Sequence, residues 1–265
     1  MSRFTLFWVA TLFVCQAGVS QDAPAKINLD DPDLVFVSDS VIPIPLEIFA
    51  SLDKLGVQDW GRQVESRDIR LDANRSRTAM LFGLVVSEGF IGVQAKDKES
   101  VRRLGRDVLA LAKPLGVSDE VEEHANAIIN AAGRDEWEVV RQELDKTRQT
   151  VINKMEENRD PHLVPLVSLG GWLGGTEALA AVLRDNYSAE GSDLLNQPEL
   201  VKQLKTDFNE LPDRARRGDL FTQVSQTLEH LESLMKSDDS GAISEGKVIE
   251  ISLATRNLVE AIYES

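Results

Sequence analysis

Apolar residues recur at spacings of three and four along most of the chain after residue 45. From Lys98 onward, for example, Val101, Leu104 and Val108 share one face of a helix. The period-two alternation of a half-buried strand is missing from this part of the sequence. The pattern therefore predicts an all-α fold, either a multi-helix bundle or a helical-repeat-like array of about eight or nine helices.

The first 44 residues carry different signals. Residues 1–20 place Arg3 before an apolar run that is too short to span a bilayer, which is typical of a secretory signal peptide. Residues 21–44 contain three prolines and a short β-rich stretch, so they predict an extended N-terminal arm. Residues 45–265 are then expected to form a single all-α domain.

Cysteine usage indicates the compartment. Cys15 is the only cysteine and lies within the predicted signal peptide, so the mature form is expected to be cysteine-free. Disulfides and thiolate chemistry are therefore excluded from the predicted mature form. Export without cysteines is more typical of a bacterial envelope than of a eukaryotic secretory route, and the expected location is periplasmic or extracellular.

The charge balance constrains the partners. The chain has 29 basic and 44 acidic residues and a formal net charge of −15. This balance opposes binding to nucleic acid and to anionic lipid surfaces. The longest uncharged runs beyond the signal peptide, at 163–176 and 78–87, are shorter than the ~20 residues that span a bilayer. The mature protein is predicted to be soluble, without a transmembrane segment.

Two matching motifs suggest an internal repeat. Gly89-Phe90-Ile91-Gly92 and Gly171-Trp172-Leu173-Gly174 share the order glycine, aromatic, aliphatic, glycine at an offset of 82 residues, and two later heptad segments match at an offset of 84. These matches predict quasi-repeats at about 72–157 and 161–237, closed by a C-terminal helix. Convergent patterning is the alternative, because heptad helices resemble one another for physical reasons.

Glycines interrupt two uncharged helical segments, although each interior glycine costs a helix about 1 kcal/mol relative to alanine. The close approach of another backbone or of a ligand would offset this cost. The candidate binding residues form two glycine-rich strips: Gly89, Phe90, Gly92, Gly171, Trp172, Gly174 and Gly175. Three explanations compete for the strips, namely core packing, a groove for a ligand or partner, and membrane insertion.

The sequence contains few motifs that would indicate catalysis or metal binding. The three histidines His124, His162 and His230 lack metal-ligand spacing, and motifs for nucleotide binding or a serine nucleophile are missing, so no metal or cofactor is predicted. Glu88 and Glu177 are the candidate buried carboxylates, because their helix neighbours are apolar enough to raise a carboxyl pKa.

The sequence as a whole predicts an exported helical protein that acts as a binding or interaction module rather than as an enzyme. A protein or a small apolar ligand is the expected partner. Two alternatives stand beside this interpretation: an envelope enzyme that uses Glu88 and Glu177, and a peripheral membrane-associated protein.

Overall fold

The computed structural model describes residues 60–237 and 242–265. The predicted signal peptide (1–20), the predicted arm (21–44) and residues 45–59 of the predicted all-α domain lie outside these residues. All described residues belong to one unit, Val37–Ser265.

Within these ranges the chain forms helices and no strands. Eight α-helices have 13 residues or more, namely α2 (Arg75–Gln94), α3 (Lys98–Leu115), α4 (Ser118–Gly133), α5 (Trp137–Glu157), α6 (Val164–Asp185), α8 (Pro198–Glu210), α9 (Asp219–Leu234) and α10 (Glu245–Glu264). The shorter elements are α7 (Ala189–Ser192), η1 (Trp60–Gln63), η2 (Pro161–Leu163), η3 (Asp193–Leu195) and η4 (Asp213–Ala215). The all-α prediction is confirmed for the described part of the chain.

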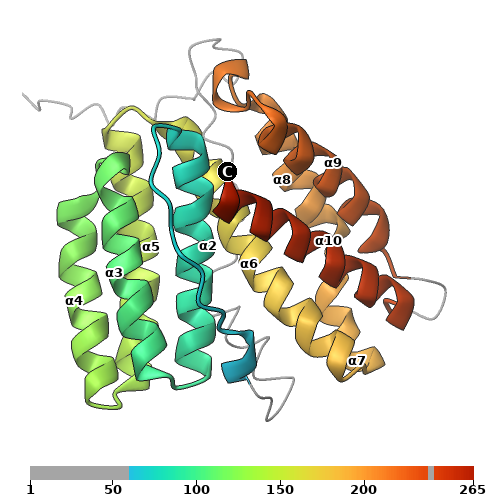
Figure 1. Cartoon of the computed structure of the whole chain (residues 1–265), viewed down its shortest axis with the longest axis horizontal. Coiled ribbons are helices and arrows are strands. Elements are labelled where there is room, and N and C mark those ends of the chain that lie inside the picture. Colours follow the sequence, from blue (N-terminus) through green and yellow to red (C-terminus); the bar gives the residue numbers. More distant parts are fainter. Residues whose placement is uncertain (1–59, 238–241) are drawn as a thin grey trace, which may run out of the picture. The chain divides into compact units, whose positions relative to one another are not determined.

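Helices α2 to α5 stand side by side (Figure 1). Each helix of this four-helix row packs on the next, and α5 also reaches α2. Local signals separate the helices: the Asp97 side chain accepts hydrogen bonds from the first backbone amides of α3, and Gly116 ends α3 with a φ of 77°. Short connections of this kind place consecutive helices antiparallel, so the row is an up-and-down bundle.

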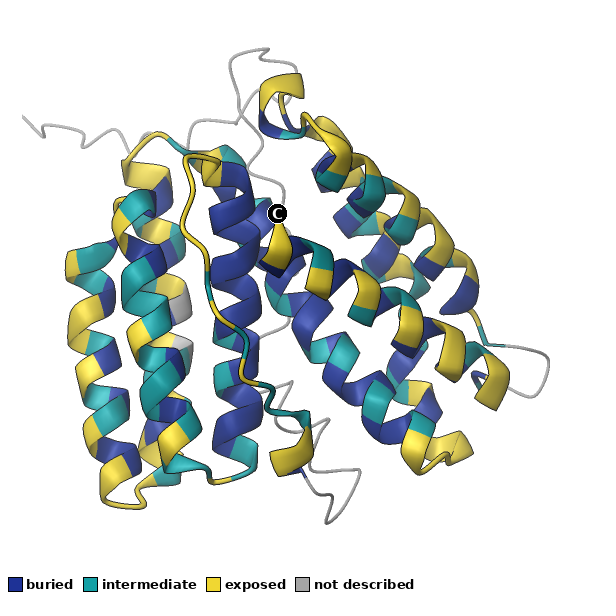
Figure 2. Ribbon diagram, viewed as in Figure 1, coloured by how far each residue is buried: buried dark blue, intermediate teal, exposed yellow. Residues whose placement is uncertain are grey.

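Helix α6 packs along α2 and carries the second half of the fold. Helix α10 packs on α6 and α9, and α8 packs on α9. Figure 2 shows that α2 is buried along almost its whole length, whereas the outer helices alternate between buried and exposed positions. One continuous apolar cluster includes residues from α2 to α10, so the two halves share a core.

Residues 60–74, which we call the strap, comprise η1 and a non-helical stretch that leads into α2. Trp60 at its start is 4% exposed and packs with Ile91 of α2 and with Ala178 and Val182 of α6. The strap therefore lies against both glycine-rich helices.

The two predicted quasi-repeats differ in their elements. The first contains the 18-residue α3, whereas the stretch that follows α6 in the second contains α7 and η3, of 4 and 3 residues. The repeat stays a prediction.

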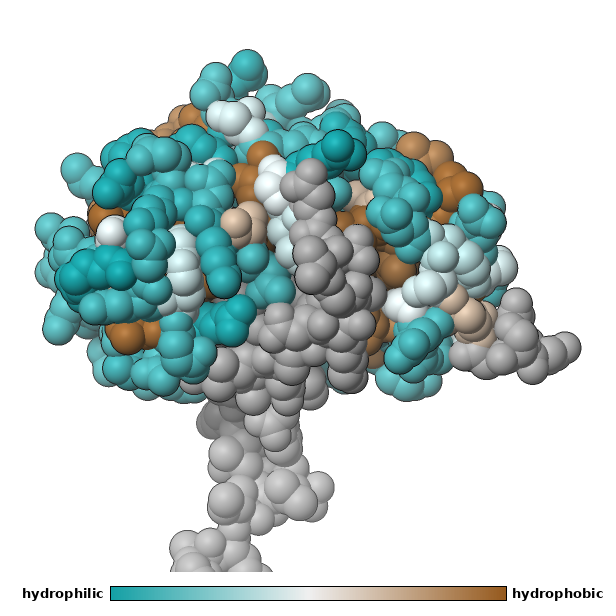
Figure 3. Space-filling view, turned by 90° about the horizontal axis from the view of Figure 1, so that it is seen from below, coloured by the Kyte–Doolittle hydropathy of each residue, from teal (hydrophilic) through white to brown (hydrophobic). Residues whose placement is uncertain are grey.

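Helix α2 and the segment Pro161–Asp185 are long and apolar enough to cross a membrane by length and composition. In the structure, 89% and 72% of their apolar windows are buried inside the protein. Buried core helices pass the same test, so their apolar character is weak evidence for membrane crossing. On the face shown in Figure 3, hydrophilic side chains predominate and hydrophobic ones form smaller patches.

Candidate functional site

The glycine-rich helices α2 and α6 pack on each other, and three glycines make the close approach possible. A Cβ added at Gly83 would overlap the carbonyl oxygen of Val167, and one at Gly170 would overlap that of Met80. A Cβ at Gly174 would overlap the Ser87 hydroxyl. Gly83 and Gly170 serve core packing between the helices, because the backbone atoms they face cannot withdraw as a flexible side chain can. Gly174 leaves room for the buried Ser87 side chain.

The other glycines of the two strips have more room. A Cβ at Gly171 would lie 3.7 Å from the Gly83 carbonyl oxygen, and one at Gly92 would lie 3.5 Å from a methyl group of Val101, both ordinary contacts. A Cβ at Gly89 or at Gly175 would meet none of the described residues within 4 Å. Packing between α2 and α6 therefore does not account for Gly89, Gly92 or Gly175.

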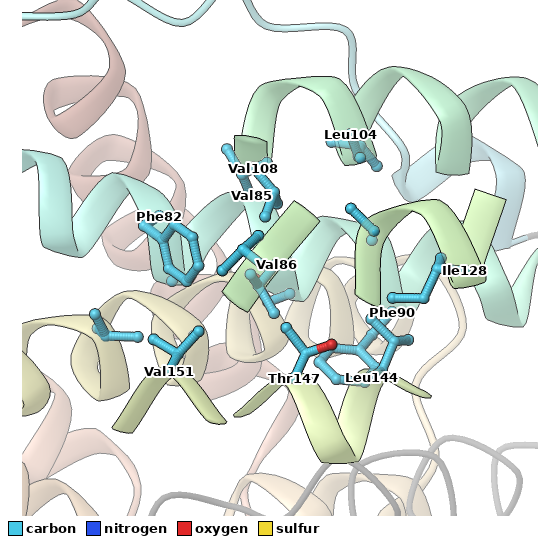
Figure 4. Close-up of a pocket in the computed structure, with 18 of the residues that line it drawn as sticks. Phe82, Val85, Val86, Phe90, Leu104, Val108, Ile128, Leu144, Thr147 and Val151 are labelled. Carbon is cyan, nitrogen blue, oxygen red and sulfur yellow. The ribbon is translucent and has the colours of Figure 1, made fainter. Parts of the chain in front are cut away.

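Gly89, Phe90, Gly171 and Trp172 come together in the wall of a cavity of about 120 Å³. The cavity lies inside the bundle of α2, α3, α4 and α5 and is bounded by α6. Figure 4 shows side chains of α3 and α5 that point into it from opposite sides. Its other lining residues are mostly aliphatic and come from the helical stripes, including Val86, Val101, Leu104, Val108, Val121, Ile128, Leu144 and Val151. Four of the seven predicted binding residues thus share one site, whereas Gly92, Gly174 and Gly175 lie outside its lining.

The cavity wall is incompletely covered. Several lining residues of α2, α3, α5 and α6 are only partly buried, namely Val86, Gly89, Gly105, Val108, Leu144, Ile152, Val167 and Gly171. The remaining wall includes fully buried residues such as Leu104 and Val121. The cavity is therefore a pocket with an apolar interior and a glycine-containing rim.

A second group of functional interest surrounds Arg67 of the strap. Its guanidinium donates from Nη1 to Glu88 Oε1 at 2.8 Å and from Nη2 to Glu177 Oε1 at 2.9 Å, and Nη2 lies 3.0 Å from Glu65 Oε2. Tyr263 of α10 donates its hydroxyl to Glu88 Oε1 at 3.0 Å, and its ring lies under the Arg67 guanidinium. Both predicted buried carboxylates thus belong to one charge cluster, and the sequence analysis missed Arg67 and Tyr263.

Burial shapes the protonation of this cluster. Glu88 is 7% exposed, and burial raises its pKa to about 7, although Arg67 and the Tyr263 hydroxyl oppose the rise. Burial also raises the pKa of Glu177, again against the influence of Arg67. Glu88 Oε2 has no hydrogen-bond partner among the described residues. A carboxyl group in this state can bind or release a proton near neutral pH.

A second cavity of about 120 Å³ adjoins the charge cluster between the strap, α6 and α10. It is largely polar, and Arg67, Glu177, Arg184 and Arg256 are among the residues that line it. Glu88 is not part of its lining. No group of three or more side chains among the described residues could hold a metal ion.

His124 takes part in an arrangement that resembles a catalytic triad. Its Nδ1 lies 3.0 Å from Glu143 Oε2 and its Nε2 lies 3.2 Å from Thr150 Oγ1. Thr150 stands inside α5, where each backbone N–H is bonded to the carbonyl four residues earlier, so the hydroxyl has no nearby backbone donors for an oxyanion. The arrangement is best explained as a polar bridge between α4 and α5.

Comparisons with protein-family models, curated proteins and solved structures find no match to this chain. The interpretation of these sites therefore depends on their own geometry.

Proposed function

We propose that the protein is an exported binding module that holds a small apolar ligand in the cavity between α2, α3, α4 and α5. The cavity itself is the observation that supports this proposal. Its lining is almost wholly apolar, so a bound apolar molecule would gain contacts with the wall and be removed from water.

Gly89 is a position where the proposal can be tested. It lines the cavity, and no described residue would lie within 4 Å of a Cβ there. Gly83 also lines the cavity, but it packs against the α6 backbone and cannot be enlarged without moving that helix.

The proposal is tested by what the protein carries from its own host. Solvent extracts of the purified wild-type chain are compared with extracts of Gly89→Leu, which adds a large side chain at a lining position, and of Gly175→Leu. Gly175 also has open space around it and lies outside the cavity lining, so it is the matched control. An apolar compound is expected from the wild type and from Gly175→Leu only. Equal recovery from all three proteins would contradict the proposal.

Catalysis at Glu88 and Glu177 is a second candidate function. The burial of Glu88, its pKa of about 7 and its unpartnered Oε2 favour it. The polar cavity reaches Glu177 and would have to admit the substrate. Turnover of any substrate found by screening should be abolished in Glu88→Gln and retained in Arg102→Gln, which changes an exposed ion pair. Retention of full activity in Glu88→Gln would end this candidate.

Export to the periplasm or outside the cell is part of the proposal and is supported by the signal-like residues 1–20. Peripheral membrane association is the remaining alternative, and the burial of α2 and α6 weighs against it. Sedimentation of the protein with vesicles of phosphatidylcholine and phosphatidylglycerol separates the two. Binding that survives a salt wash would favour the membrane alternative.

A further inference from the structure

The cavity contains three side-chain hydroxyl groups, and each donates its proton within its own helix. Ser87 donates to the Leu84 carbonyl oxygen at 2.7 Å, Thr147 to that of Glu143 at 2.7 Å, and Ser168 to that of Val164 at 2.8 Å. A hydroxyl group has only one proton to donate. None of the three therefore offers a hydrogen-bond donor to a ligand in this geometry.

Trp172 carries the remaining side-chain N–H in the lining. Its Nε1 donates to Gln197 Oε1 at 3.1 Å, and Gln197 does not line the cavity. The indole ring therefore presents carbon atoms to the cavity. No lining residue among the described residues carries a charge.

From this saturation of every side-chain donor we propose that the cavity takes a hydrocarbon group without hydrogen-bond acceptor atoms. The inference depends on the proposed ligand-binding function and narrows it to a chemical class. An acceptor atom of a ligand would lose its bonds to water on entry and find no side-chain donor in exchange, which lowers the affinity. A cavity of about 150 Å³ holds one benzene molecule, so the cavity of about 120 Å³ takes a group of at most about six carbon atoms.

Two sources could supply such a group. A free small hydrocarbon would fill the cavity by itself. The incompletely covered rim near Gly89 and Gly171 would instead admit the hydrocarbon end of a longer molecule whose polar group stays in water. The lining chemistry is the same for both sources.

Benzene and pyridine form a matched pair of probes, because the two rings have the same size and differ by one C–H group, which is a nitrogen acceptor in pyridine. Both are titrated into the full chain at pH 8, where pyridine is uncharged, and binding is followed by saturation-transfer NMR of the ligand. We expect benzene to bind and pyridine to bind at least about tenfold more weakly. Gly89→Leu should weaken or abolish the benzene signal, and Gly175→Leu should retain it.

The outcomes separate the inference from the function on which it depends. Pyridine that binds as tightly as benzene, with binding lost in Gly89→Leu, would overturn the hydrocarbon class and leave the ligand-binding function standing. The absence of binding by both probes would overturn the inference, whereas the host extracts test the function independently. Octanoate that competes with benzene supports the class with a chain end as the source, and benzene binding without such competition supports it with a free hydrocarbon.

Discussion

Gly170 of α6 lies so close to Met80 of α2 that a Cβ at Gly170 would overlap the Met80 carbonyl oxygen. The same helix contains Gly175, where a Cβ would meet nothing within 4 Å. Two glycines five residues apart on one helix therefore have opposite structural meanings. One is required by a neighbouring backbone, and the other only lowers the helical propensity of its segment.

The alanine variants of these two glycines should accordingly change stability in opposite directions. Gly170→Ala is expected to lower the free energy of unfolding by about 2 kcal/mol or more, because α2 and α6 must separate to admit the methyl group. Gly175→Ala should raise it by about 0.5–1 kcal/mol through helix propensity. Urea denaturation measures both values, and a Gly170→Ala protein as stable as the wild type would contradict the close packing of α2 and α6.

Removal of the Arg67 side chain should be costly. In Arg67→Ala the carboxyl groups of Glu88 and Glu177 stay largely buried without their cation, and the expected loss of stability is about 3 kcal/mol at pH 8. The loss should be smaller at pH 5, where Glu88 is protonated and needs no cation. Arg102→Ala, which breaks an exposed pair with Glu99, is the control and should cost less than about 1 kcal/mol.

Glu88 should make stability depend on pH. Burial raises its pKa from 4.5 to about 7, so the folded state binds a proton more tightly than the unfolded state. The corresponding stability is fully present below pH 4.5 and is lost as the pH rises through 7. It amounts to about 3 kcal/mol at most. Other carboxyl groups titrate as well, so the quantity to measure is the difference between wild type and Glu88→Gln.

That difference should shift in favour of Glu88→Gln as the pH rises from 5 to 8.5, because the amide cannot ionise. A constant difference across this range would show that Glu88 has an ordinary pKa in the folded protein.

Arg77 of α2 caps the C-terminal end of α10 with side-chain hydrogen bonds. Its side chain is 1% exposed, and it donates from Nε to the Ile262 carbonyl oxygen and from Nη2 to that of Tyr263, both at 2.9 Å. Arg77→Met should leave these terminal carbonyls without partners and destabilise the protein by about 3 kcal/mol. Amide exchange in the last turn of α10 should increase in Arg77→Met. It should stay unchanged in the control Arg256→Met, which replaces a half-exposed arginine of α10 itself.

Much of the cavity wall could be anticipated from helical periodicity. Val101, Leu104 and Val108 were assigned to one apolar face from their spacing alone, and all three line the cavity. What periodicity could not show is that the apolar faces of the helices meet without filling the space between them. The spacing of apolar residues shows which face of a helix is apolar. Whether a cavity forms depends on the distances among the four helices, which the spacing does not give.

The charge cluster illustrates the same limit. The apolar neighbours of Glu88 and Glu177 indicated burial, and both carboxyl groups are largely buried. Arg67 lies 21 residues before Glu88 and 110 before Glu177, in a segment without helical pattern, and Tyr263 lies near the other end of the chain. No local sequence pattern predicts that Arg67 and Tyr263 contact Glu88, because contacts between residues so far apart in the chain depend on how distant segments pack.

The sequence by itself determined the succession of helices from about residue 75 onward, since the apolar period and the helix-ending residues act within a few residues of each other. The same prediction covered residues 64–74, which form the non-helical part of the strap. Only the tertiary structure decided what each glycine and each carboxylate does. Gly83, Gly89 and Gly170 are the same residue in similar helices, yet only Gly89 has open space beside it. The physical reason is that close contact and burial arise between elements far apart in the chain, and a local pattern carries no measure of the distance between them.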